Sequence, residues 1–126
     1  MRNTETVDQE NVVAFLRDTL PAYGRRVFAV PNEREHKGDA RQRAATWRAA
    51  VRRGASPGVS DLIIPGAPPL APHCGGVAIE MKRGPKAPWR PGQLPWLLHF
   101  AAIGWIAARC NSEQEALELV QGVGYV

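Results

Sequence analysis

The sequence has few cysteines and no long apolar segment. Cys74 and Cys110 are its only cysteines, and they form neither a Cys-x-x-Cys motif nor a cluster with a histidine pair, which disfavours zinc and a disulfide framework. No apolar run approaches the roughly 20 residues that a membrane span needs, and the first residues lack a basic segment followed by an apolar signal core. We expect reduced thiols, no membrane partner and a cytoplasmic protein.

Aromatic residues are also scarce, at 7% of the chain, and no aromatic ribonucleoprotein motif or Gly-x-x-Gly loop between helices is present. A small RNA-binding domain is therefore the least favoured function class. What remains is a chain of 126 residues with 44% hydrophobic content, which is enough to bury one modest core. We expect one domain over residues 1–126.

Positive charge is unevenly distributed, although the formal net charge is only +4. Basic residues concentrate in the second quarter of the chain and again after residue 81 (Arg25, Arg26, Arg34, Lys37, Arg41, Arg43, Arg48, Arg52, Arg53; Lys82, Arg83, Lys86, Arg90). Such clusters suit a phosphate backbone, while an arginine-rich helix face that only contacts solvent is the alternative for the first cluster.

The hydrophobic pattern predicts helix, strand, helix, strand, strand, helix, strand and helix in that order. The expected elements cover residues 6–20, 25–30, 39–53, 61–65, 77–82, 93–103, 105–110 and 112–121. This order predicts an α/β protein with a mixed β-sheet flanked by helices. The fourth and fifth elements should pair antiparallel, and the strand at 105–110 should lie parallel to a neighbour.

The expected helix at 39–53 has a narrow apolar face. Ala40, Ala44, Trp47 and Val51 follow one another at steps of four, three and four, and the arginines occupy its other faces. Trp47 fits a core position on this face, as Trp96 and Trp105 do on their own elements, whereas Trp89 falls in a loop where it could stack on a base.

Three charged residues interrupt the two central strands. Asp61 opens the first of them, and Glu80 and Lys82 share one face of the second because side chains alternate along a strand. If the strands pair, two carboxylates roughly 5 Å apart repel by about 3 kcal/mol at an effective dielectric near 20. A hard divalent cation such as Mg²⁺ binds oxygen ligands and relieves that repulsion.

These motifs resemble the PD-(D/E)XK nuclease superfamily, whose fold is restriction-endonuclease-like, and within it the stand-alone VRR-NUC (virus-type replication-repair nuclease) domains. The resemblance spans residues 10–119 and rests on Pro31-Asn32, Gly58-Val59-Ser60-Asp61, Glu80-Met81-Lys82 and Gln93, in order. The superfamily's usual Pro before the Asp is Ser60 here. By this resemblance we expect the core element order that the hydrophobic pattern also predicts.

The resemblance implies a Mg²⁺- or Mn²⁺-dependent endonuclease that hydrolyses phosphodiester bonds in structured DNA such as Holliday junctions. Stand-alone relatives are associated with phages and bacteria and form homodimers. Asp61, Glu80 and the Met81 backbone carbonyl would hold the metal, with Lys82 at the phosphate. Glu10 would assist at the metal and Gln93 at the water or phosphate, and contacts to DNA would come from the other polar residues of the motifs and clusters (Asn32, Arg34, Lys37, Arg41, Arg83, Lys86, Arg90).

Each assignment has a structural alternative. Asp61 could cap a strand edge, Glu80 could form an exposed ion pair with Lys82, Glu10 could be a surface helix residue, and Gln93 could be a first-turn polar residue. The competing function is a non-catalytic DNA-binding module with a nuclease-like fold, in which the basic residues bind DNA and the acids only form ion pairs.

Overall fold

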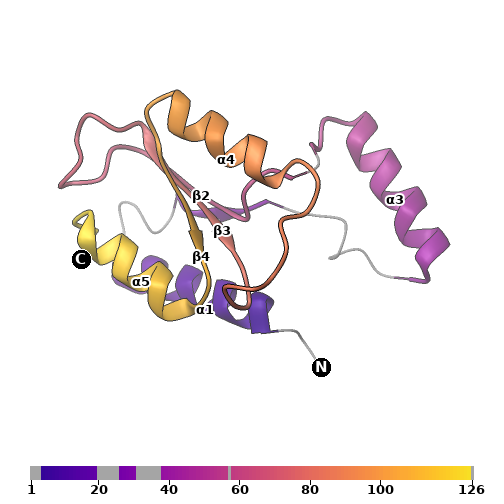
Figure 1. Ribbon diagram of the computed structural model, residues 1–126, viewed down its shortest axis with the longest axis horizontal. Coiled ribbons are helices and arrows are strands. Elements are labelled where there is room, and N and C mark those ends of the chain that lie inside the picture. The colour runs from indigo at the N-terminus through magenta and orange to yellow at the C-terminus, as the bar shows by residue number, and fades with distance from the viewer. Residues whose placement is uncertain (1–3, 20–25, 31–37, 57, 126) are drawn as a thin grey trace.

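The computed structural model describes residues 4–19, 26–30, 38–56 and 58–125, and its elements follow the predicted order. They are α1 (Thr4–Thr19), β1 (Phe28–Ala29), α3 (Ala40–Arg52), β2 (Leu62–Pro65), β3 (Gly76–Met81), α4 (Gln93–Ala102), β4 (Ile106–Cys110) and α5 (Glu113–Gly122). The predicted α/β class with a mixed sheet is confirmed (Figure 1).

The four strands form one sheet in the order β1-β2-β3-β4. β1 pairs antiparallel with β2, and β2 pairs antiparallel with β3, with Leu62 opposite Ile79 and Ile64 opposite Val77. β4 lies parallel to β3 after the α4 crossover. Both strand directions that the sequence predicts for the central pair and for β4 are confirmed.

Helices cover both faces of the sheet. α1 and α5 lie on one face and contact each other, while α4 lies on the other face against β3 and β4 (Figure 1). The core fills the space under α1 and α5, where Val77, Ile79 and Met81 of β3 pack with Val12, Leu16, Ala116 and Val120. Because side chains alternate along a strand, Ala78, Glu80 and Lys82 point to the α4 face.

The first strand is shorter than the predicted 25–30. β1 comprises only Phe28 and Ala29, and Arg25 lies outside the described residues. Strand pairing continues one residue further, since the Val30 N–H donates to the Asp61 carbonyl at 2.9 Å. This hydrogen bond ties the chain just before β2 to the edge of the sheet.

α3 is formed as predicted but does not join the core. Asp39 caps it through a reciprocal capping box with Gln42, which satisfies backbone groups that would otherwise lack partners. No residue of α3 is buried, and the helix stands apart from the sheet (Figure 1). The expectation that Trp47 occupies a core position is therefore wrong, as it is for the half-buried Trp96 and Trp105.

The described helices do not have the length and apolar content that a bilayer crossing requires.

Candidate active site

The predicted catalytic residues meet where β2 begins and β3 ends. Leu62 lies opposite Ile79, so the antiparallel register continues with Asp61 opposite Glu80. Residues directly opposite in such a pair have Cα atoms about 4.5–5.5 Å apart and side chains on the same face. Both carboxylates lie on the α4 face, and both are almost completely buried, at 4% and 1% exposure.

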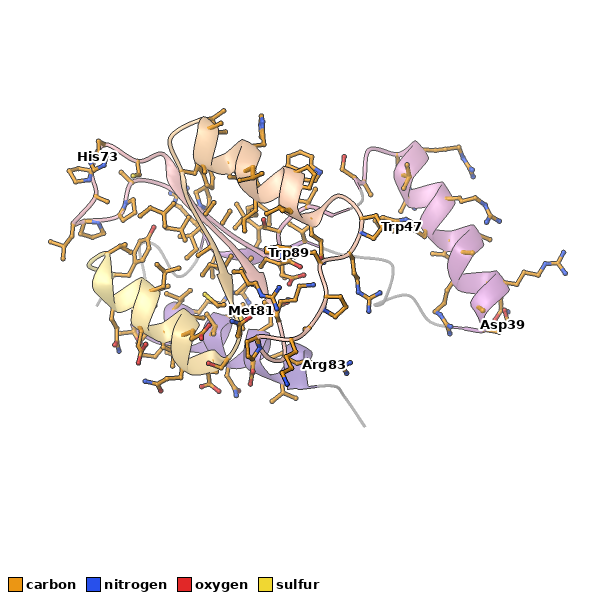
Figure 2. The ribbon with its side chains drawn as sticks, viewed as in Figure 1. Asp39, Trp47, His73, Met81, Arg83 and Trp89 are labelled. Carbon is orange, nitrogen blue, oxygen red and sulfur yellow. The ribbon has the colours of Figure 1, made fainter. Side chains whose placement is uncertain are left out.

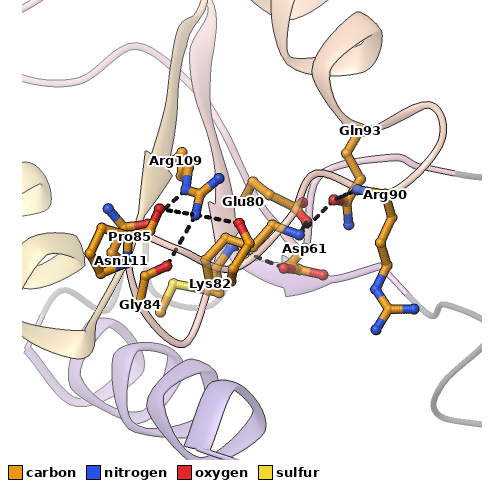
Figure 3. A network of polar contacts seen from close by, with 11 residues as sticks. Asp61, Glu80, Lys82, Gly84, Pro85, Arg90, Gln93, Arg109 and Asn111 are labelled. Carbon is orange, nitrogen blue, oxygen red and sulfur yellow. Dashed lines mark hydrogen bonds and ion pairs between the residues drawn. The ribbon is translucent and has the colours of Figure 1, made fainter.

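Asp61 is fixed by the backbone of the neighbouring strand. Its Oδ2 accepts a hydrogen bond from the Met81 N–H at 2.9 Å (Figure 3). The Lys82 N–H points the other way, to the Cys110 carbonyl of β4, at 2.8 Å. Because successive peptide groups alternate between strand edges, the Met81 carbonyl points to the edge where Asp61 lies. This edge therefore presents carboxylate and carbonyl oxygens together.

Lys82 is a buried lysine held between two site residues. Its Nζ lies 2.6 Å from Gln93 Oε1 and 3.7 Å from Glu80 Oε1, and its side chain is 2% exposed. An ammonium group withdrawn from water needs such partners, because desolvating a charge is costly. The structural alternative expected an exposed ion pair with Glu80, but the pair in the structure is buried. The ammonium therefore lies beside Glu80, one of the predicted metal ligands.

Gln93 is oriented by two donors. Its Oε1 accepts from Lys82 Nζ and, at 2.7 Å, from the Arg90 N–H (Figure 3). Since both neighbours donate, the oxygen must be the amide atom between them. Gln93 therefore positions Lys82 with its carbonyl end, and the amide NH₂ end is the part that can face a water or phosphate.

Gly58 explains why the segment before Asp61 can approach α4. Its φ is +85°, and a Cβ at this position would lie 2.3 Å from the Gly92 carbonyl carbon and 2.6 Å from the Gln93 nitrogen. Only a residue without a side chain fits both the left-handed conformation and this backbone contact. The glycine of the Gly-x-x-Asp motif thus allows the segment before Asp61 to lie against the N-terminus of α4, where Gln93 is located.

The donor set fits a hard divalent cation. Two carboxylates and one ammonium leave an excess of negative charge among the three side chains, and the available donors are oxygens, which Mg²⁺ and Mn²⁺ prefer. Among the described residues, no group of three or more acidic, histidine or cysteine side chains is arranged to hold a metal. Two carboxylates are enough for Mg²⁺, because this ion keeps several of its water ligands and is usually bound through only one or two carboxylates. The structure does not bring Glu10, exposed on α1, together with the two acids as a third ligand.

Arg109 is a site residue that the sequence analysis missed. It lies beside Glu80 in the β3–β4 register, and its Nη2 donates to the carbonyls of Gly84, Pro85 and Ala87 at 3.0, 3.2 and 2.7 Å (Figure 3). The guanidinium carbon lies 5.0 Å from the centre of the Trp89 ring. Arg109 therefore fastens the loop at 83–92, and the only sequence signal for it is a charge within an apolar strand.

Trp89 lies in the loop at 83–92, as expected, and two cations lie next to its ring. Its ring centre is 5.9 Å from Lys82 Nζ as well as close to Arg109, so two cations flank one aromatic ring. Such cation–π contacts stabilise by about 0.5–1 kcal/mol at exposed sites and by more when desolvated. The ring is 37% exposed and forms part of the wall of the site.

The predicted DNA-binding residues fall into three groups. Asn32, Arg34 and Lys37 lie outside the described residues. Arg83, Lys86 and Arg90 are exposed on the loop at 83–92, and Arg90 extends away from the polar network (Figure 3). Arg41 is exposed on α3. The loop group directly follows Lys82 in the sequence and so adjoins the buried acids.

The cysteines do not contribute to the site. Burial, and to a lesser extent the Glu115 carboxylate, raise the pKa of the Cys110 thiol from 9.0 to about 11. A thiol with this pKa stays protonated at neutral pH, which disfavours a role as a nucleophile. Cys74 is a half-exposed free thiol.

Ser60 yields a stability prediction. Its hydroxyl is fully buried and has no hydrogen-bond partner among the described residues. We expect Ser60→Ala to leave the free energy of unfolding unchanged or to raise it by about 1 kcal/mol, because the hydroxyl loses its hydration without a replacement. Urea denaturation measures the change.

The control for this prediction is Ser112→Ala. Ser112 Oγ caps α5 by accepting from the Glu115 N–H at 3.2 Å, so the same substitution there should lower stability by about 1 kcal/mol. A comparable loss for Ser60→Ala would show that its hydroxyl is hydrogen-bonded after all.

The fold is that of a solved VRR_NUC domain protein. This structure superposes with a TM-score of 0.72 over 98% of the present chain and 90% of its own, at 19% sequence identity. No protein-family model and no curated protein matches the chain. The predicted resemblance is thereby confirmed for the fold.

Proposed function

We propose that this protein is a Mg²⁺- or Mn²⁺-dependent endonuclease that hydrolyses phosphodiester bonds in structured DNA. The observation that carries the proposal is the convergence of Asp61, Glu80, Lys82 and Gln93 on one buried patch where β2 begins and β3 ends. A domain that only bound DNA would gain nothing from two buried adjacent carboxylates, since they repel phosphate and destabilise the fold.

Asp61, Glu80 and the Met81 carbonyl are the groups that would hold the metal. A bound divalent ion in such a site activates a water and offsets charge on the phosphate oxygens. The Met81 N–H holds Asp61 through one of its two carboxylate oxygens. This preorganisation keeps the carboxylate in place without reorganisation during the reaction.

Lys82 is proposed to stabilise the charge that develops on the phosphate. Gln93 and Glu80 hold its ammonium group in place, and Trp89 covers it from the loop side. A fixed cation in a water-poor site stabilises a pentacoordinate phosphorus far more than a solvated one does. The Gln93 NH₂ group would then donate to the attacking water or to a phosphate oxygen.

The preferred substrate is proposed from the family resemblance to be branched DNA, cut by a homodimer. A two-fold pair of subunits presents two sites to a four-way junction of matching symmetry. The test uses a labelled junction, a flap and a plain duplex with Mg²⁺, Mn²⁺ or chelator, together with the mass of the protein in solution. Metal-stimulated cleavage, strongest on the junction, is the expected result.

The alternative of a non-catalytic DNA-binding module makes the opposite forecast in the same experiment. All three substrates would bind, and none would be cut with either metal. Cleavage of the flap or duplex in preference to the junction would retain the nuclease and remove the junction preference.

A prediction for Arg109 concerns the loop at 83–92. Arg109→Met keeps most of the side-chain stem but removes every guanidinium donor to the loop carbonyls. We expect trypsin to cut after Arg83 and Lys86 at least about tenfold faster, because losing hydrogen bonds worth about 1 kcal/mol each raises the population of open loop. Mass spectrometry of the digest measures the rate.

Arg52→Met is the matched control, since Arg52 is exposed on α3. In the Arg52→Met variant, the loop at 83–92 should be cut at the wild-type rate. An Arg109→Met protein with an unchanged cutting rate would show that the loop is held by other contacts.

A further inference from the structure

α3 carries a one-sided row of arginines. Arg41, Arg48 and Arg52 are all exposed, and at 100° per residue their positions on the helix fall within about 40° of one another. We call these three residues the arginine ridge. At a rise of about 1.5 Å per residue the ridge is about 16 Å long, which corresponds to roughly five base-pair steps of DNA.

The apolar face of α3 and the arginine ridge are directed differently. Ala44, Trp47 and Val51 lie about 90° around the helix from the ridge. Figure 2 shows Trp47 on the side of α3 that faces the rest of the molecule, and Trp47 is half-buried. The ridge is therefore turned about 90° from the side of α3 that faces the rest of the molecule, and it is exposed on a helix that stands apart from the sheet (Figure 1).

Charge is the strongest feature of this surface. α3 contains no acidic residue, and within the described residues 38–56 the one acid is Asp39, the N-cap that accepts from the Gln42 N–H. Within the described part of the chain, no ion pair joins the ridge to an acid. A row of cations without internal counter-ions attracts a polyanion, and its spacing along a straight helix suits a linear one.

We propose that the arginine ridge of α3 binds the phosphate backbone of duplex DNA at a distance from the catalytic acids, as a separate contact that holds one arm of the substrate. The inference rests on the proposed function, since it assumes a DNA substrate. It adds a second contact surface, distinct from the loop at 83–92, through which the enzyme recognises duplex flanking the cleaved bond.

The test is DNA binding by Arg41→Ala/Arg48→Ala/Arg52→Ala, measured by fluorescence polarisation with a labelled duplex in chelator at 50–200 mM salt. If each arginine contacts one phosphate, the slope of log affinity against log salt should fall in magnitude by about 2.7. At 100 mM salt the affinity should fall on the order of a hundredfold. The triple lysine variant should restore most of both, because it keeps the charges.

Single substitutions provide the matched control. Arg48→Ala removes a cation of the ridge. Arg53→Ala also removes an arginine, but position 53 lies about 140° around the helix axis from position 48. Arg48→Ala should lower the salt slope by about 0.9, and Arg53→Ala should not change it. Equal effects of the two variants would overturn the ridge in favour of a general charge effect.

Two further outcomes would also overturn the proposal. One is wild-type affinity and salt slope in the triple alanine variant. The other is a change of solution mass in that variant with DNA affinity retained, which would make the ridge an interface between copies of this chain. Binding is measured without metal, so loss of binding in the variant supports the ridge proposal even if the wild type cuts no DNA. If the variant binds and cleaves DNA as the wild type does, the ridge proposal is wrong and the proposed nuclease function is unaffected.

Discussion

Asp61→Asn is expected to lower metal-dependent DNA cleavage by about a thousandfold or more while leaving DNA binding in chelator near the wild-type level. Asp61 Oδ2 accepts from the Met81 N–H, so an asparagine must place its oxygen there and direct its NH₂ group toward the site. A hydrogen-bond donor then faces the position where a cation would bind. Single-turnover cleavage of a labelled junction measures the loss.

The same variant should separate a metal site from a merely structural acid. Wild-type protein gains about 2.7 kcal/mol from a ligand at one hundred times its dissociation constant, so Mg²⁺ should raise its melting temperature by several degrees. Asp61→Asn should not respond to Mg²⁺, and in chelator it should melt at the same or a higher temperature, because one of two adjacent buried carboxylates is gone.

Asp18→Asn is the control for this pair of measurements. Asp18 is exposed on α1, and the substitution makes the same chemical change away from the site. It should cleave DNA and respond to Mg²⁺ as the wild type does. Cleavage by Asp61→Asn at the wild-type rate would show that Asp61 is not a metal ligand, and the proposed site would then be wrong.

Gly58→Ala is expected to destabilise the protein by about 2–4 kcal/mol and to reduce cleavage by at least tenfold. The added Cβ would meet Gly92 and Gln93 backbone atoms at 2.3–2.7 Å, and backbone cannot yield as a flexible side chain does. Relief of this clash must move either the segment before Asp61 or the start of α4. Either movement disturbs the contact of Gln93 with Lys82.

Gly104→Ala isolates the steric part of this effect. Gly104 has φ +89°, close to the +85° of Gly58, but a Cβ there would meet nothing within 4 Å. It should lower stability only by the roughly 1–2 kcal/mol that the left-handed conformation itself costs, with cleavage retained. Chemical denaturation and cleavage rates compare the two variants, and equal behaviour would show that the contact with α4 does not matter.

The sequence predicted those features that depend on local periodicity. Alternation along β3 placed Glu80 and Lys82 on one face, and the antiparallel pairing of β2 and β3 brought Asp61 opposite Glu80. The order and type of every described element followed from the spacing of apolar residues and turn residues. The roles of these residues in metal binding and catalysis stay predictions that the proposed experiments address.

Features that depend on contacts distant in the sequence were not predictable. Arg109 acts on carbonyls more than 20 residues earlier, so its role appears only once β3 and β4 are adjacent. The apolar spacing of α3 predicted a helix correctly, but it carried no information on what that face would contact. Gly58 belonged to a recognised motif, yet the reason for it is the approach of Gly92 from another element.

In the β2–β3 hairpin, the candidate site and the connecting segment lie at opposite ends of the strands. Asp61 precedes β2 and Lys82 follows β3, whereas the segment at 66–75 joins the other ends of these strands, about 13 Å away at 3.4 Å per residue. That segment has little part in shaping the acidic site around Asp61 and Glu80. An insertion between its exposed residues Pro72 and His73 is therefore expected to leave the site undisturbed, whereas Leu70 must stay in place because its N–H donates to the Val123 carbonyl at 2.9 Å.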